Sequence, residues 1–227
     1  MKISIIIPAF NEEQAIGKVV GTLPKGLLDE IIVVDNGSTD NTAKIAAAAG
    51  ARVVFEPRPG YGAACFAGAQ ASRDSDIIVF LDGDYSDDPD QLEMIINPVL
   101  HDEADLVIGS RITGELEKNA IPLHGRLGNR FLVLMLRMLH GINISDLGSF
   151  RAIKTPALFK LNMEQMTYGW PIEMVVKAAR HGLRLKSVPI RYRRRIGQSK
   201  ITGTWKGTIL ATYFLLMVPM KYFFGQK

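Results

Sequence analysis

Two aspartates separated by one glycine, Asp82-Gly83-Asp84, are the residues of this chain best suited to do chemistry. They follow an apolar run that ends at Leu81, and the glycine lets the backbone bend so that both carboxylates can face one hard cation. Mg²⁺ is commonly held by one or two carboxylates together with the phosphates of a substrate. The motif therefore predicts a metal that is carried with a diphosphate. The alternative is a solvated acidic turn before a helix that begins near Pro89.

A further carboxylate, Asp35, ends a second apolar run. An acidic residue at such a position can accept hydrogen bonds from a ribose or a base, as it does in nucleotide-binding folds. The turn signal Asn36-Gly37 follows directly, so Asp35 could equally stabilise that turn. Both roles remain open for Asp35 at this stage.

A basic segment near the C-terminus carries five cationic side chains within ten residues, namely Arg191, Arg193, Arg194, Arg195 and Lys200. Guanidinium forks and a lysine in such a run can close over phosphate groups. Two other interpretations are a solvated basic loop and an anchor for anionic lipids ahead of the apolar C-terminal stretch.

Charge is distributed unevenly along the chain. The net charge is +4, yet residues 1–173 hold 15 basic and all 23 acidic side chains, whereas residues 174–227 hold 12 basic side chains and no acidic one. Acidic strand ends would repel a polyanion, so nucleic acid is not expected as a partner. The single cysteine, Cys65, cannot form an intramolecular disulfide, and a reducing compartment is expected.

Short apolar runs alternate with helical stretches along the chain. Ile- and Val-rich runs with little polar alternation predict strands buried on both faces of a sheet, at 3–8, 30–35, 52–56, 76–81 and 105–108, with later strands at 150–153 and 185–192. Helices are expected at 12–23, 39–50, 62–72, 89–100, 126–140 and 172–182. This order predicts an α/β fold with a doubly wound, mostly parallel central sheet and helices on both faces. Ligands of such sheets bind at the carboxyl ends of the strands, where the aspartates described above are expected.

The C-terminal segment contains twelve uncharged residues, Ile209 to Met220, fewer than the ~20 that span a bilayer. Aromatic residues and lysines flank the run, which is typical of a segment lying in a membrane interface. A buried helix that closes the domain explains the same pattern. We therefore expect a main domain over 1–203 and an amphipathic or apolar C-terminal helix over 204–227.

Several short motifs occur together in an order that resembles one family. They are Pro-Ala-Phe-Asn-Glu (8–12), Val-Val-Asp-Asn-Gly-Ser-Thr-Asp (33–40), Leu-Asp-Gly-Asp (81–84), Gly-Ser-Arg (109–111), Asp-Leu-Gly-Ser-Phe-Arg (146–151) and Arg-Arg-Ile-Gly-Gln-Ser-Lys (194–200). The combination is similar to that of family 2 glycosyltransferases, and most similar to the polyprenyl-phosphate branch that resembles dolichol-phosphate-mannose synthase. The resemblance implies a GT-A fold, a catalytic domain over 1–203, and transfer of a sugar from a nucleotide-diphospho-sugar with inversion.

The resemblance also implies roles for individual residues. The base and ribose would be held by Pro8, Phe10, Glu12 and Asp35. Mg²⁺ or Mn²⁺, bridging the diphosphate, would be bound by Asp82 and Asp84 with Gly83 between them. Phosphate or acceptor would be contacted by Arg111 and Arg126, and the pyrophosphate would be covered by Arg194 and Lys200.

Three positions depart from the family pattern: Phe10 stands where Tyr is frequent, Asn36 where a second Asp is common, and Ser86 where mannosyl enzymes often have Gln. These departures leave the choice of base and sugar open.

The expected chemistry follows from charge. A nucleoside diphosphate gains negative charge as it leaves, and a metal on Asp84, together with Arg194 and Lys200, would stabilise it. Transfer to a hydroxyl needs a general base, for which Asp146 and Glu173 are candidates. A lipid phosphate is already ionised near neutral pH and needs no strong base.

The leading hypothesis is an inverting, metal-dependent glycosyltransferase that moves a hexose from a UDP- or GDP-sugar to a polyprenyl phosphate. It would act in the cytoplasm, peripherally at the cytoplasmic face of the membrane, which the C-terminal segment would contact. One alternative is transfer to a soluble or saccharide hydroxyl with Asp146 or Glu173 as base. Another is a non-catalytic subunit that binds a nucleotide-sugar.

Overall fold

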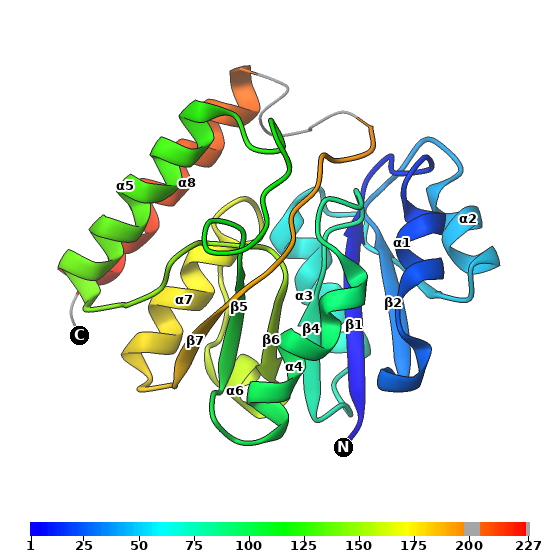
Figure 1. Cartoon of the computed structure of the whole chain (residues 1–227), viewed down its shortest axis with the longest axis horizontal. Helices are drawn as coiled ribbons and strands as arrows, with labels where there is room; N and C mark the ends of the chain where they lie inside the picture. The colour runs from blue at the N-terminus through cyan, green and yellow to red at the C-terminus, as the bar shows by residue number, and fades with distance from the viewer. Residues whose placement is uncertain (198–204, 226–227) are drawn as a thin grey trace.

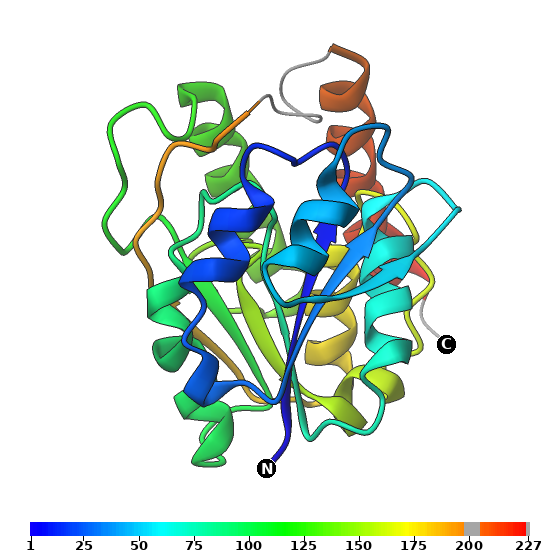
Figure 2. The ribbon, with the colours of Figure 1, turned by 90° about the vertical axis from the view of Figure 1, so that its right-hand side faces the viewer.

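A seven-stranded sheet runs through the centre of the computed structural model, which describes residues 1–197 and 205–225 apart from the side chains of 205–209 and 211 (Figures 1 and 2). Its strands are β1 (Ile3–Ala9), β2 (Glu30–Asp35), β3 (Arg52–Phe55), β4 (Ile77–Phe80), β5 (Leu106–Ser110), β6 (Arg151–Lys154) and β7 (Leu185–Pro189). They lie in the order β3-β2-β1-β4-β6-β5-β7. Only β6 is antiparallel to its neighbours in this sheet, so the predicted mostly parallel sheet is confirmed.

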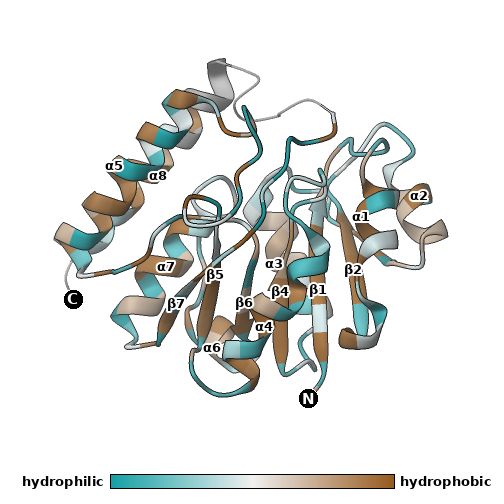
Figure 3. Ribbon diagram, viewed as in Figure 1, coloured by the Kyte–Doolittle hydropathy of each residue, from teal (hydrophilic) through white to brown (hydrophobic). Residues whose placement is uncertain are grey.

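Helices cover both faces of the sheet, as predicted. One face, formed on β1 by Ile5 and Ile7, packs against α1 (Ile16–Thr22), α2 (Thr42–Ala48) and α4 (Leu92–Leu100). The opposite face, to which Ile6 contributes, packs against α3 (Tyr61–Ala71), α6 (Thr155–Lys160) and α7 (Trp170–Arg180). Successive side chains of a strand point to opposite faces, so a continuous apolar run supplies two cores. The strands are accordingly mostly brown in Figure 3.

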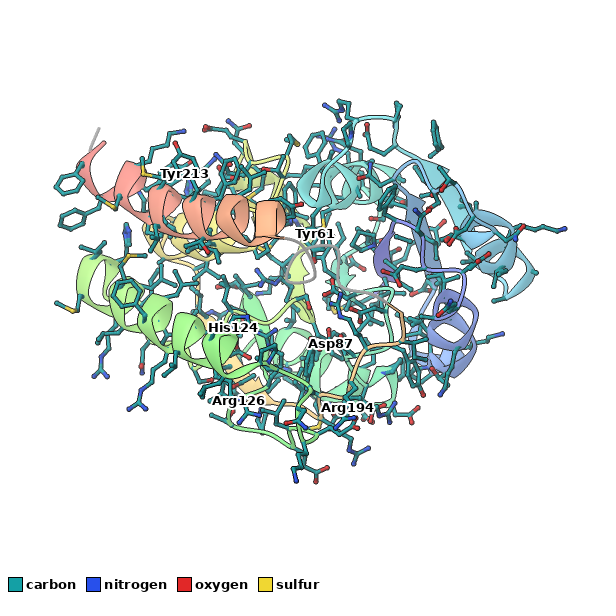
Figure 4. All side chains as sticks on the ribbon, turned by 90° about the horizontal axis from the view of Figure 1, so that it is seen from above. Tyr61, Asp87, His124, Arg126, Arg194 and Tyr213 are labelled. Carbon is teal, nitrogen blue, oxygen red and sulfur yellow. The ribbon has the colours of Figure 1, made fainter. Side chains whose placement is uncertain are left out.

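Two long helices, α5 (Leu123–His140) and α8 (Trp205–Phe224), lie side by side beyond α7 (Figures 1 and 4). α8 packs against both α5 and α7, with Val218 buried and Nε2 of His140 lying 3.0 Å from the carbonyl oxygen of Pro219. Large apolar side chains of the same helix remain exposed on its other side, among them Tyr213 and Phe224. The C-terminal run is therefore a helix with one packed side and one exposed side.

Within the described part of the chain, no helix has the length and hydropathy needed to cross a membrane.

Some expected boundaries were wrong. Helix α1 begins at Ile16 rather than at residue 12, and in the segment before it the N–H of Glu12 donates to Oγ1 of Thr42 at 2.8 Å and the N–H of Glu13 to Oδ2 of Asp40 at 3.2 Å. These bonds tie the loop after β1 to the loop after β2. The strand expected to reach residue 192 ends at Pro189, and α6 was not expected at all.

Close packing of α3 on β1 can be tested at Gly68. A Cβ there would lie 2.3 Å from Cγ2 of Ile6, so Gly68→Ala should lower the free energy of unfolding by about 1–3 kcal/mol through overpacking. Gly21 in α1 has no heavy atom within 4 Å of its Cβ position, and Gly21→Ala should leave stability unchanged or raise it by roughly 0.5–1 kcal/mol. Urea denaturation measures the free energy of unfolding of both variants. Equal changes in the two would contradict the close approach of α3 to β1 at Gly68.

Candidate active site

A cavity of about 600 Å³ opens at the carboxyl ends of β1, β2 and β4. Its walls include six of the residues predicted to bind the donor or the metal: Pro8, Phe10, Glu12, Asp82, Gly83 and Asp84. Further walls come from Asn36, Tyr61, Thr167, Tyr168, Arg195 and Leu210. Parallel strands end at the same edge of a sheet, which is why segments distant in sequence meet here.

Asp84 is nearly fully buried, and both of its carboxylate oxygens have partners. Oδ1 accepts the N–H of Ser86 at 2.9 Å, and Oδ2 lies 2.5 Å from Nη2 of Arg195. Asp82 accepts the hydroxyl of Tyr61 at 3.2 Å. Burial raises the pKa of Asp82, and the negative charge of Asp84 raises it further. Two crowded carboxylates at a strand end thus favour a positive charge beside them.

The protein ligands at this site suit a cation that binds together with the phosphates of a substrate. Among the residues described, no three or more His, Cys, Asp or Glu side chains cluster so as to hold a metal. Asp82 and Asp84 offer only carboxylate oxygens, and Mg²⁺ characteristically completes such a sparse set with water and substrate phosphates. The motif therefore fits a metal–diphosphate and does not fit a metal caged by protein alone.

The predicted base-and-ribose side of the cavity is shaped by Asn36. Its amide nitrogen donates to the carbonyl oxygens of Glu56 at 2.9 Å and Arg58 at 2.7 Å, while its Oδ1 accepts the N–H of Gly60 at 2.8 Å. The segment 56–60 is thereby fixed against the end of β2. The sequence indicates only a turn residue and a departure from the family pattern at Asn36, because its partners lie twenty or more positions away.

Asp35 and Phe10 lie at different places on the predicted base-and-ribose side of the cavity. Oδ1 of Asp35 accepts the N–H of Ser38 at 3.0 Å, so the predicted turn-stabilising role is present, and this buried carboxylate lies one residue from the cavity wall. Phe10, by contrast, presents a 45% exposed ring at the wall.

Asp146, a candidate base, is fully buried and completely engaged. Its two oxygens form a bidentate ion pair with Nε and Nη2 of Arg111, both at 2.7 Å, and they also accept the N–H groups of Arg111 and Leu147 at 2.8 Å. Burial alone would lower the pKa of Arg111, but the bonds to Asp146 raise it above its ordinary value. Both oxygens of Asp146 are thus taken by donors within the fold, and neither residue lines the cavity.

Glu173, the other candidate base, is also fully buried and acts as an anchor. Its Oε2 accepts the N–H groups of Glu164 at 3.0 Å and Gln165 at 2.8 Å, and its Oε1 lies 2.7 Å from the Tyr222 hydroxyl and 3.0 Å from Nζ of Lys177. The carboxylate joins α8 to the segment 164–168, which supplies Thr167 and Tyr168 to the cavity wall.

The basic segment places Arg195, rather than Arg194, on the cavity. Nε of Arg194 donates to the carbonyl oxygen of Lys118 at 2.9 Å, and its backbone N–H donates to Glu117 at 2.8 Å. Its side chain lies at the outer edge of the molecule in Figure 4, whereas Tyr61 and Asp87 lie toward the middle.

Of the other predicted residues, Arg126 does not line the cavity. Arg126 is exposed on the first turn of α5, where its Nε donates to the carbonyl oxygen of Ile121 at 3.2 Å (Figure 4). Lys200 lies outside the described residues.

The anchoring role of Glu173 can be tested on α8. Tyr222→Phe removes a hydrogen bond to a buried carboxylate and should lower the free energy of unfolding by about 1–2 kcal/mol. Tyr213 is on the same helix with a largely exposed ring, so Tyr213→Phe, the matched control, should change stability by less than about 0.5 kcal/mol. Chemical denaturation measures both; equal losses would show that the Tyr222 hydroxyl does not stabilise the fold.

Comparisons with known proteins agree with this geometry. The profile of glycosyl transferase family 2 matches residues 4–161. An uncharacterized glycosyltransferase of Mycobacterium tuberculosis is 35% identical over 92% of this chain and 94% of the relative. A dolichyl-phosphate hexose transferase of Haloferax volcanii is 32% identical over 88% of this chain and 86% of the relative.

Solved structures show the same architecture. Glucosyl-3-phosphoglycerate synthase from Mycobacterium tuberculosis, crystallised with Mg²⁺ and UDP, superimposes with a TM-score of 0.79 at 26% identity, over 100% of this chain and 80% of that one. The same enzyme crystallised with Mn²⁺ and UDP-glucose superimposes with a TM-score of 0.78 over the same shares. The implied GT-A fold is confirmed, and the chain belongs to glycosyl transferase family 2.

Proposed function

We propose that this chain transfers a hexose from a UDP- or GDP-sugar to a polyprenyl phosphate, with inversion and with Mg²⁺ or Mn²⁺. The observation that carries the proposal is a single cavity that contains Asp82 and Asp84 at the end of β4 and reaches Leu210 on the C-terminal helix. The transfer would take place in the catalytic domain 1–203, at the cytoplasmic face of a membrane that the segment 204–227 contacts.

The donor would lie along the strand ends. Pro8, Phe10 and Glu12 would contact the nucleoside, with Asp35 accepting a hydrogen bond from the ribose, and Asn36 would hold the wall on the same side of the cavity. Solved structures of glucosyl-3-phosphoglycerate synthase contain Mg²⁺ with UDP or Mn²⁺ with UDP-glucose, which supports a nucleoside diphosphate here.

The leaving group would be stabilised by positive charge. A divalent cation on Asp82 and Asp84 would supply a Lewis acid that neutralises charge on the diphosphate as the glycosidic bond breaks. Arg195 is the described cation nearest to these carboxylates in the cavity wall. Arg194 and Lys200, from the same basic segment, would also contribute to phosphate binding.

The acceptor would carry its own negative charge. Asp146 and Glu173 are both fully bonded within the fold, which favours an acceptor oxygen that is ionised without a protein base. A lipid phosphate meets that condition, and a relative is named as a dolichyl-phosphate hexose transferase. Arg111 and Arg126 would bind the acceptor phosphate in this scheme.

Transfer to a hydroxyl of a soluble or saccharide acceptor is the second candidate, and it would need Asp146 or Glu173 as a base. Glucosyl-3-phosphoglycerate synthase, a structural neighbour, was crystallised in complex with phosphoglyceric acid. The remaining alternative, a subunit that binds the nucleotide-sugar without turnover, predicts no product with either acceptor.

An exposed apolar surface on α5 and α8 favours the lipid acceptor. We call it the α5–α8 surface, and it comprises Leu127, Phe131, Leu134, Met138, Leu210, Tyr213, Met217 and Phe224. The α5 members recur at helical spacing, so they share one side of the helix. Exposed Arg126, Arg130 and Arg137 border this side, and residues 118–145 and 174–227 contain no acid. An apolar stripe bordered by arginines matches an anionic lipid surface.

Turnover can be tested with a donor and acceptor panel. UDP- and GDP-hexoses are incubated with Mg²⁺ or Mn²⁺, with polyprenyl phosphate, 3-phosphoglycerate or neither, and release of nucleoside diphosphate is measured. We expect release to require polyprenyl phosphate. Asp84→Asn should lower turnover by at least about 10²-fold because charge stabilisation at the leaving group is lost.

Asp90→Asn is the matched control for Asp84→Asn. Asp90 belongs to the same acidic run, but its side chain is exposed and lies outside the cavity wall. Its substitution should leave turnover within about twofold. Release driven by 3-phosphoglycerate alone would replace the lipid acceptor by the soluble one.

Lipid docking can be tested by sedimentation with vesicles of phosphatidylcholine and phosphatidylglycerol. A Phe131→Ser, Met138→Ser variant should bind them at least about tenfold more weakly, because both side chains are exposed on the α5–α8 surface. Phe55→Ser is the control, since Phe55 is 65% exposed on the edge strand β3, away from this surface. Equal losses in the two variants would exclude the α5–α8 surface as the docking site.

A further inference from the structure

Arg195 contacts the carboxylate that the proposed metal needs. Its Nη2 lies 2.5 Å from Oδ2 of Asp84, while Oδ1 of Asp84 is taken by the N–H of Ser86 at 2.9 Å. Oδ2 is therefore the oxygen of Asp84 that pairs with the Arg195 side chain rather than with the backbone. A cation that binds Asp84 at this oxygen must displace Arg195 or share the oxygen with it.

The backbone places Arg195 at this position. Residues 192–196 run antiparallel to residues 84–87: the N–H of Arg193 donates to the carbonyl oxygen of Ser86 at 2.7 Å, and the N–H of Ile196 donates to that of Asp84 at 2.8 Å. The Arg193 side chain adds an ion pair of 2.8 Å with the buried Asp88. The Arg195 backbone consequently stays beside Asp84 whichever way its side chain points.

The cavity around Arg195 is negatively charged. Burial alone would lower the pKa of this guanidinium, but the charges of Asp84, Asp82 and Glu12 raise it. Its side chain is one-third exposed and forms part of the cavity wall. It is thus close enough to neutralise Asp84 and exposed enough to turn toward a ligand in the cavity.

We propose that Arg195 is an exchangeable counterion of Asp84 that makes binding of the divalent cation depend on the nucleoside diphosphate. Bound to Asp84, the guanidinium competes with the metal for Oδ2. When metal and diphosphate enter together, Arg195 gives up Asp84 and gains the diphosphate oxygens, for which its planar fork is well suited. This inference rests on the proposed function in one respect, the placement of the metal on Asp84.

The consequence is coupled binding. Metal alone must break the Arg195–Asp84 pair with nothing to replace it, whereas metal with nucleotide offers Arg195 a new anionic partner. Each ligand therefore raises the affinity for the other by the same factor. Because of this coupling, less metal binds at the site when no nucleotide-sugar is present.

The experiment measures Mn²⁺ affinity by electron paramagnetic resonance and UDP or GDP affinity by calorimetry, using the full chain. Arg195→Ala should tighten Mn²⁺ binding without nucleotide by about fivefold and weaken nucleotide binding at saturating Mn²⁺ by about tenfold, so that the coupling shrinks. Arg195→Lys, which keeps the charge but loses the fork, should fall between wild type and Arg195→Ala.

Arg52→Ala is the matched control. It removes the same charge from an exposed side chain at the amino end of β3, which pairs with Glu30 outside the cavity wall. We expect its Mn²⁺ affinity without nucleotide to stay within about twofold of wild type, since a single exposed charge at a distance is screened. Thermal unfolding of each variant checks that the fold is retained.

Two sets of outcomes distinguish a failure of this inference from a failure of the proposed function on which it rests. Unchanged or weaker Mn²⁺ binding in Arg195→Ala, or equal effects of Arg195→Ala and Arg52→Ala, would overturn the counterion role while leaving the metal site intact. A wild-type chain that binds no Mn²⁺ with UDP or GDP, or an Asp84→Asn variant that binds it normally, would overturn the metal site and the inference together.

Discussion

Repulsion between carboxylates at the end of β4 is the interaction on which the site depends. Asp84, Asp87 and Asp88 are buried within a few residues of Asp82, and such a group is stable only with cations beside it. The segment 191–195 supplies them: Arg191 and Arg193 each reach Asp88 at 2.8 Å, and Arg195 reaches Asp84. The acidic middle and the basic end of the chain are thus two sides of one electrostatic contact. That contact draws the basic segment across the mouth of the sheet.

Two further buried carboxylates form ion pairs within the fold. Asp146 holds Arg111, and Glu173 ties α8 to the segment that carries Thr167 and Tyr168. Breaking such a pair would leave an uncompensated buried charge, so both carboxylates stabilise the fold. Through Glu173, the wall of the cavity is joined to the helix that bears part of the α5–α8 surface. Donor binding and the proposed lipid contact would therefore share one structural support.

Sequence and structure agree where the signal is local. The apolar runs predict the strands because burial on both faces requires continuous Ile and Val, and Asp82-Gly83-Asp84 follows such a run directly. Agreement ends where a residue acts through a distant partner. Arg194 and Arg195 are adjacent and chemically identical, and only the pairing of 192–196 with 84–87 decides which of them reaches Asp84. The loop before α1 likewise bonds to distant residues, since the N–H groups of Asn11 and Glu12 donate to the side chains of Ser38 and Thr42.

The sequence by itself determined the α/β class, the motif order typical of the family and the edge of the sheet at which the carboxylates gather. These follow from periodicity and from residue types, which are properties of short segments. The tertiary structure decided that Asp146 and Glu173 are bonded to partners within the fold, that Asn36 holds the wall of the cavity, and that Arg195 rather than Arg194 pairs with Asp84. Each of these depends on which charges and backbone groups lie within hydrogen-bond reach, and folding brings such partners together from positions as distant as Asp84 and Arg195, which are more than a hundred residues apart.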